Sequence, residues 1–234
     1  MTCLHEGKSC IDSFDGICIN ISRINHSCGP NSEFFLNGED EMEIRATSKI
    51  LMGQEITISY MPSTVMKKNH ERQKILSEEK GFLCTCELCQ DEDINDDDHE
   101  IYEKFQNLAK EIELIGDKSI AKISICRFEK VMSCQKEMYN LAKSKTAPKM
   151  FLYFIISRGF FSGACGYYFS KEDRNEESVE KMEYFKEECG KLSKVGIQIA
   201  KMITGKESFV TKNWIERNQD LDVWCKNNLT KSSK

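Results

Sequence analysis

Cys84, Cys86 and Cys89 lie within six residues and form a dense group of potential metal ligands. A structural zinc ion is usually held by four ligands in tetrahedral geometry, and cysteine thiolates are common among them. Cys28, more than fifty residues earlier, is the natural fourth ligand, and the neighbouring His26 is an alternative. The four cysteines could also be buried free thiols, but the C-x-C-x2-C spacing favours a metal site.

Two further motifs carry polar groups that suit a binding or catalytic site. The first is Asn-His-Ser-Cys-Gly-Pro-Asn at residues 25–31, and the second is Gly-Gln-Glu-Ile-Thr-Ile-Ser-Tyr at residues 53–60. Asn25 and His26 each have an ordinary alternative, as a turn residue and as a structural histidine. Tyr60 ends a predicted strand, where its ring could also be a core aromatic that faces inward.

Strands and turns are expected around these motifs. Residues 16–22 suit a short strand, and residues 32–47 read as a hairpin with Asn37-Gly38 as the turn signal. Residues 55–60 alternate apolar and polar side chains as a strand does. Residues 64–80 are polar with scattered apolar positions and predict one short helix before the cysteines.

An acidic run at residues 91–100 is interpreted as a linker, and the pattern of apolar residues after it is typical of helices. Apolar residues between Val179 and Met202 recur every three and four positions, the pattern of an amphipathic helix. Weaker stripes of the same kind cover residues 101–115, 120–143 and 207–226. The predicted fold class is therefore α+β, with a first domain over residues 1–90 and an all-α domain over residues 101–234.

One segment, residues 150–169, is apolar over the length of about 20 residues that a membrane span needs. Arg158 lies near its middle, where a charge is costly in a bilayer, and glycines interrupt it. We therefore expect a buried helix or helix pair, and no membrane partner.

The cysteine content and the net charge limit the cellular locations and binding partners that we expect for this protein. The chain has 12 cysteines, and its N-terminus lacks the apolar core of a signal peptide, which favours reduced thiols and a cytoplasmic or nuclear location. The net charge of −5 gives no general attraction for nucleic acid. Five further cysteines occupy helix-compatible positions and are interpreted as core: Cys126, Cys134, Cys165, Cys189 and Cys225.

The order and spacing of the three motifs resemble the C-terminal part of a SET domain followed by its post-SET cysteines. The closest resemblance is to the SMYD-like branch, in which a helical C-terminal domain follows. It covers residues 16–90, about a third of the chain, and implies a partial SET β-fold with a zinc-binding post-SET segment. The opening, cofactor-wrapping strands of SET are not expected before Asn25.

The resemblance also implies roles for single residues. Asn25 and His26 would contact S-adenosylmethionine, and Phe82 would stack on its adenine ring. Tyr60 would be the catalytic residue that aligns the substrate amine. Zn²⁺ would be bound by Cys28, Cys84, Cys86 and Cys89.

The implied function is protein-lysine N-methyltransferase, acting on a histone tail or a non-histone protein with an accessible lysine. A partner protein on the helical domain is a further expectation. The alternative is a catalytically inactive SET fragment that serves as a zinc-stabilised protein-interaction module.

Overall fold

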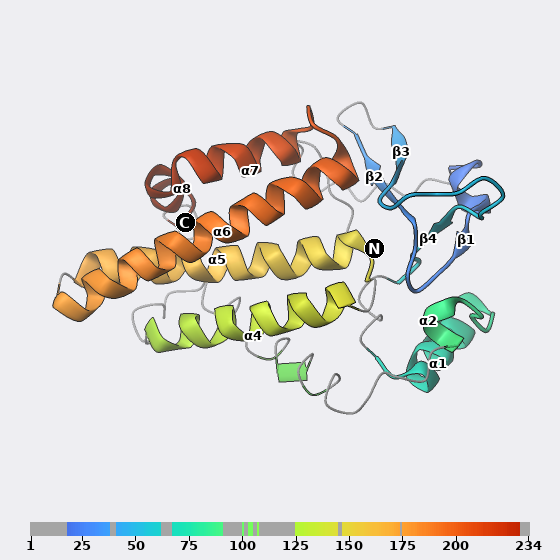
Figure 1. Cartoon of the computed structure of the whole chain (residues 1–234), viewed down its shortest axis with the longest axis horizontal. Coiled ribbons are helices and arrows are strands. Elements are labelled where there is room, and N and C mark those ends of the chain that lie inside the picture. The colour runs from blue at the N-terminus through green and yellow to red at the C-terminus, as the bar shows by residue number, and fades with distance from the viewer. Residues whose placement is uncertain are drawn as a thin grey trace. The chain divides into compact units, whose positions relative to one another are not determined.

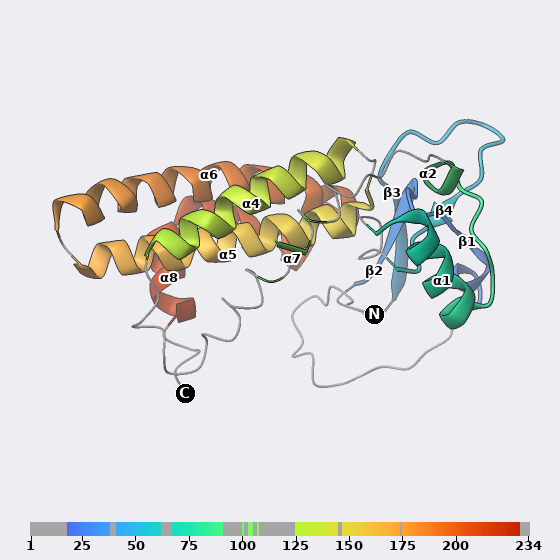
Figure 2. The same ribbon diagram turned by 90° about the horizontal axis from the view of Figure 1, so that it is seen from below.

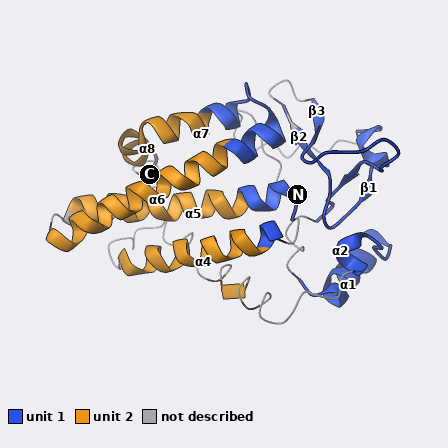
Figure 3. Ribbon diagram, in the orientation of Figure 1, with its two compact units in different colours: residues 1–99, 142–153, 198–212 blue, residues 100–141, 154–197, 213–234 orange. Residues whose placement is uncertain are grey.

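The computed structural model describes residues 18–37, 41–61, 67–90, 100, 103–104, 107, 125–144, 147–173 and 175–229. The chain forms two compact units (Figure 3). Unit 1 comprises residues 1–99, 142–153 and 198–212, and unit 2 comprises residues 100–141, 154–197 and 213–234. The expected acidic linker at 91–100 and helix at 101–115 lie outside the described residues, apart from positions 100, 103, 104 and 107.

Unit 1 contains two small sheets (Figure 1). In the first, β1 (Asn25–His26) pairs in parallel with β4 (Thr57–Ile58). In the second, β2 (Ser32–Leu36) and β3 (Met42–Ala46) are antiparallel, as the hairpin prediction required. The strand expected at residues 16–22 is wrong over its described part, because Ile21–Arg23 form a 3-10 turn, labelled η1.

Helix α1 (Asn69–Lys80) begins later than the predicted helix at residues 64–80. It ends at Gly81, whose positive φ of 77° is the left-handed conformation that glycine adopts without steric penalty. The short helix α2 (Glu87–Gln90) carries the last cysteine of the post-SET group. These two helices place the cysteine segment beside the strands of unit 1.

Unit 2 is helical, and some of its helices continue into segments assigned to unit 1 (Figures 1 and 3). Residues 150–169 fall within one continuous helix, α5, and no described helix is long and apolar enough to cross a membrane. The predicted amphipathic stripe between residues 179 and 202 lies in α6. The helices are α4 (Ile125–Ser144), α5 (Lys149–Asp173), α6 (Glu176–Thr204), α7 (Phe209–Gln219) and α8 (Leu221–Leu229).

The core of unit 2 joins four of these helices, of which α4, α5 and α6 run side by side in Figures 1 and 2. Its buried members are Phe128, Val131 and Met132 of α4, Ala164, Cys165 and Tyr167 of α5, Phe185 of α6 and Cys225 of α8. Four of the five cysteines assigned to the core are buried, but the assignment of Cys126 is wrong. Cys126 lies in the first turn of α4 and is exposed.

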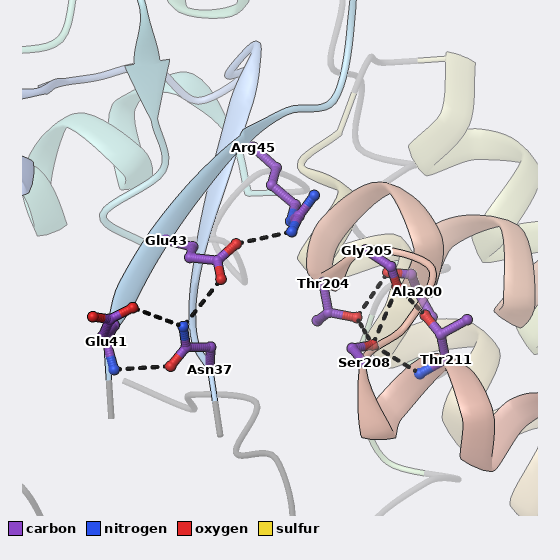
Figure 4. A network of polar contacts seen from close by, with 9 residues as sticks. All are labelled: Asn37, Glu41, Glu43, Arg45, Ala200, Thr204, Gly205, Ser208 and Thr211. Atoms are coloured by element: carbon purple, nitrogen blue, oxygen red, sulfur yellow. Dashed lines mark hydrogen bonds and ion pairs between the residues drawn. The ribbon is translucent and has the colours of Figure 1, made fainter. Parts of the chain in front are cut away.

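A polar network in unit 1 stabilises the turn between α6 and α7 (Figure 4). The hydroxyl oxygens of Thr204 and Ser208 are 2.6 Å apart, and Thr211 donates its hydroxyl to the carbonyl of Gly205 at 2.7 Å. Gly205 has φ of 90°, and a Cβ there would lie 2.9 Å from the guanidinium carbon of Arg45. Only glycine combines this backbone with so close an approach from the hairpin.

Candidate active site and metal centre

The four predicted metal ligands meet in unit 1. The sulfur atoms of Cys28, Cys84, Cys86 and Cys89 all lie within 4.8 Å of one another, and those of Cys28 and Cys89 are 3.5 Å apart. A tetrahedral zinc site with Zn–S distances of about 2.3 Å places its sulfurs about 3.8 Å apart. The donor set and its spacing therefore fit a tetrahedral zinc ion after small adjustments.

Hydrogen bonds favour the thiolate form of one member of this cluster, Cys86. Bonds from the thiols of Cys28 and Cys89 lower the pKa of Cys86, whose sulfur also accepts the backbone N–H of Cys28 at 3.4 Å. The pKa of Cys28 is raised, because its thiol hydrogen-bonds to Cys86 and Cys89 and is buried. Metal binding requires thiolates, so N–H donors near the sulfurs assist it.

His26 connects the cysteine cluster to Tyr60. Its Nδ1 accepts the backbone N–H of Tyr60 at 3.0 Å, which leaves the proton of the neutral ring on Nε2. Nε2 lies 3.4 Å from the sulfur of Cys28 and can donate to it. Desolvation lowers the pKa of His26 and so favours this neutral ring. Both ring nitrogens thus have protein partners, and His26 positions the chain at Tyr60.

Three aromatic rings gather at this point. The ring of Tyr60 lies 5.2 Å from that of His26 and 6.2 Å from that of Phe82, and Phe82 lies 5.8 Å from His26. Tyr60 donates its hydroxyl to the carbonyl of Ile24 at 2.6 Å, which fixes the direction of the phenol. The structure thus brings together all four residues predicted for cofactor binding and catalysis, since Asn25 directly precedes His26.

Asn31, the last residue of the first motif, holds the two motifs together. Its side-chain oxygen accepts the N–H of Thr57 at 2.9 Å, and its amide nitrogen donates to the carbonyl of Glu55 at 2.8 Å. The carboxylate of Glu55 accepts the amide of Asn25 at 2.6 Å. These bonds hold residues 25–31 against residues 55–57.

A cavity of about 600 Å³ opens beside these groups. Asn25, His26, Tyr60 and Phe82 line it together with two of the cysteines. Its described lining also includes the carboxylates of Glu55 and Glu87 but no lysine or arginine. A volume in this range accommodates a small cofactor, and the charge of the lining favours a cationic group over an anion.

Comparisons with known proteins agree with the motifs. The sequence model of the SET domain matches residues 2–61. The chain is 34% identical over 102 residues to the histone-lysine N-methyltransferase SMYD3 of Homo sapiens, covering 42% of this chain and 23% of that protein. The chain carries a SET segment that is similar to those of SMYD-like proteins. Histone-lysine N-methyltransferase set5 of Schizosaccharomyces pombe is 41% identical over 69 residues, which cover 29% of this chain and 21% of that protein.

A third relative of the SET segment is the protein-lysine N-trimethyltransferase SMYD5 of Danio rerio. It is 35% identical over 91 residues, which cover 36% of this chain and 22% of that protein. The matched region of this chain therefore corresponds to less than a quarter of the length of each of these relatives. The small sheets, the four-cysteine cluster and the helices that follow agree with the predicted α+β fold, a partial SET fold with a zinc-binding segment.

Sequence reasoning missed three residues of this SET site. Glu55 contacts Asn25, and nothing in its position at the start of a predicted strand indicates that role. Asn31 bridges two motifs, a role that its position after a proline does not indicate. Arg72 is completely buried in α1, donates to the carbonyl of Leu88 and reaches the sulfur of Cys89, but the helix around it reads as polar surface.

Proposed function

We propose that this SET segment binds S-adenosylmethionine and takes part in methyl transfer to a lysine side chain of a protein. The observation that supports it best is the convergence of Asn25, His26, Tyr60 and Phe82 on one cavity beside four clustered cysteines. The relatives are named as histone-lysine and protein-lysine methyltransferases, which supports a protein lysine as the substrate group.

The residues of the cavity suit the two ends of such a cofactor. Its ammonium and sulfonium are cationic, and the lining offers carboxylates without competing lysine or arginine. Phe82 presents a ring for adenine, and Asn25 presents an amide fixed by Glu55. When bound, S-adenosylmethionine supplies an activated methyl group.

Tyr60 is the proposed catalytic residue. A free lysine has a pKa of about 10.4, so the amine must lose its proton to act as a nucleophile. The Tyr60 hydroxyl donates its hydrogen to the carbonyl of Ile24, so its oxygen remains able to accept a hydrogen bond, and Tyr60 lines the cavity. An oxygen fixed in this way can accept a hydrogen bond from the incoming amine and orient it, and it need not act as a general base.

The test of this function combines cofactor binding with methyl transfer. We expect the zinc-loaded chain to bind S-adenosylmethionine in a calorimetric titration and to transfer a labelled methyl group to core histones or to other lysine-rich proteins. Tyr60→Phe should retain binding and lose at least about tenfold in transfer rate. Tyr184→Phe, on the exposed side of α6, is the matched control and should retain both activities.

Two results would contradict the catalytic proposal. Transfer that persists in Tyr60→Phe would remove that residue from the chemistry. A zinc-loaded chain that binds no S-adenosylmethionine would instead favour the interaction-module alternative, in which the helices bind a partner protein and the SET segment is scaffold.

The proposed metal is zinc, held by Cys28, Cys84, Cys86 and Cys89. Metal analysis of the purified chain should find about one zinc ion per molecule. Cys28→Ser and Cys84→Ser should each lose most of it, whereas Cys126→Ser, at an exposed thiol, should retain it. An unchanged zinc content in Cys28→Ser would exclude that residue from the ligand set. A reduced thiol cluster of this kind suits a cytoplasmic or nuclear location.

A further inference from the structure

Arg72 is a buried cation that has no carboxylate partner among the residues that the structure describes. It lies in the middle of α1 with a relative exposure of 0%. Its Nη1 donates to the carbonyl of Lys67 at 2.5 Å, and its Nη2 donates to the carbonyl of Leu88 at 2.8 Å. In the part of the chain that the structure describes, no Asp or Glu forms an ion pair with it.

The guanidinium of Arg72 lies beside the cysteine cluster. Nη2 of Arg72 lies 3.7 Å from the sulfur of Cys89, which is also buried. A guanidinium stays charged at all physiological pH values, and burying a charge is unfavourable unless an opposite charge compensates it. Four thiolates around one Zn²⁺ carry a net charge of −2, which a single nearby cation would halve.

Two neutral neighbours on the same face of α1 already fix the backbone of the cysteine segment. Asn69 donates to the carbonyl of Cys89 at 2.7 Å. Gln73 donates to the carbonyl of Cys84 at 2.6 Å and accepts its N–H at 2.8 Å. Asn69 lies three residues before Arg72 and four before Gln73, and residues at these spacings share a face of a helix. Arg72 therefore approaches the cluster from the same side of α1 as these two neutral side chains. Docking of the segment therefore does not by itself require a positive charge.

We propose that Arg72 is the counter-charge of the metal centre, a positioning residue that stabilises the zinc–tetrathiolate form of the cluster. This inference rests on the proposed zinc site. The charge and the N–H donor act together: they favour deprotonated sulfurs, and they keep the excess negative charge of the centre from being buried unpaired.

Zinc affinity of the full chain, measured by competition with a chromophoric chelator, tests the proposal. Arg72→Gln retains hydrogen bonding without charge and should lower the affinity by about ten- to a hundredfold, the usual effect of removing an outer-shell partner. Arg72→Lys retains the charge and should lie closer to the wild type. Lys74→Gln removes a charge from the exposed side of the same helix and should leave the affinity unchanged.

A double-mutant cycle separates charge compensation from packing. Cys89→His keeps a ligand but replaces the contacted thiolate by a neutral imidazole. The loss caused by Arg72→Gln should then be clearly smaller in the Cys89→His background than in the wild type. Equal losses in both backgrounds would overturn the proposal and make Arg72 a packing residue.

Two further outcomes are distinguishable. If Arg72→Gln does not fold, Arg72→Lys decides: near-normal zinc affinity supports the charge role, and a loss of zinc overturns it. A wild-type chain that binds no zinc would refute the metal centre itself, whereas a zinc-binding wild type with unchanged affinity in Arg72→Gln would refute only the counter-charge.

Discussion

Glu33 provides a quantitative test of the packing within unit 1. This carboxyl group lies on β2 with 2% exposure, and its Oε1 accepts the N–H of Met150 in the first turn of α5 at 3.2 Å. Burial raises its pKa from the ordinary value of 4.5 to about 7, although the helix N–H groups and Lys149 oppose the change. The carboxyl thus satisfies a helix N-terminus while its charge is poorly solvated.

The sign of the pH effect follows from the raised pKa. Between pH 4.5 and about 7 the folded state binds more protons than the unfolded state, so the free energy of unfolding falls as the pH rises. At about 1.36 kcal/mol for each pKa unit, the full loss is about 3 kcal/mol and is reached above pH 7. Glu33→Gln retains the oxygen that accepts the Met150 N–H and removes this loss.

Urea unfolding of the zinc-loaded protein at pH 5 and pH 8 measures the effect. Glu33→Gln should have nearly the stability of the wild type at pH 5 and exceed it by about 3 kcal/mol at pH 8. Glu41→Gln is the matched control, because that carboxylate is exposed on the same hairpin and stays in water. A difference between Glu33→Gln and the wild type that does not grow with pH would refute the reasoning.

Three further predictions concern stability, each checked by urea unfolding. Gly166→Ala would place a Cβ 2.5 Å from the buried ring of Phe185 and should destabilise the chain by about 1–3 kcal/mol. A Cβ at Gly190 would have no atom within 4 Å, so Gly190→Ala should stabilise the chain by about 0.5–1 kcal/mol. Gly205→Ala should lose about 1–2 kcal/mol or more, because its φ is 90° and the Arg45 guanidinium lies in the way; a neutral result would contradict this conformation. Asn31→Ala leaves a strand N–H without its acceptor and should lose about 1–3 kcal/mol together with cofactor binding, and unchanged binding would separate it from the site.

Local signals in the sequence carried most of the correct predictions. The hairpin follows from alternation around a turn signal, and α6 from an apolar stripe with helical spacing, because both patterns lie within one element. The four-cysteine cluster was also predictable, since three ligands are adjacent in sequence and zinc requires a fourth. Tyr60, His26 and Phe82 were predicted to share a site through their resemblance to SET motifs, and their rings do lie together.

Other features depend on contacts that no local pattern encodes. The strand expected at residues 55–60 shortens to Thr57–Ile58, because the side chain of Asn31 takes hydrogen bonds that a neighbouring strand would otherwise form. Arg72 sits in a helix with few apolar residues, so its burial becomes visible only when Leu88 and the cysteines pack on that face. Cys126 has a helix-compatible position, but the first turn of α4 leaves it exposed.

The sequence separations within the site have a consequence for how this protein folds. Tyr60 and Ile24 are 36 residues apart, Asn25 and Glu55 are 30 apart, and Cys28 and Cys89 are 61 apart. Each contact closes a long loop, and closure entropy must be overcome before the contact can stabilise anything. The complete metal centre can therefore form only after the ribosome has released Cys89. A chain that stops before this cysteine would lack one of the four clustered sulfurs.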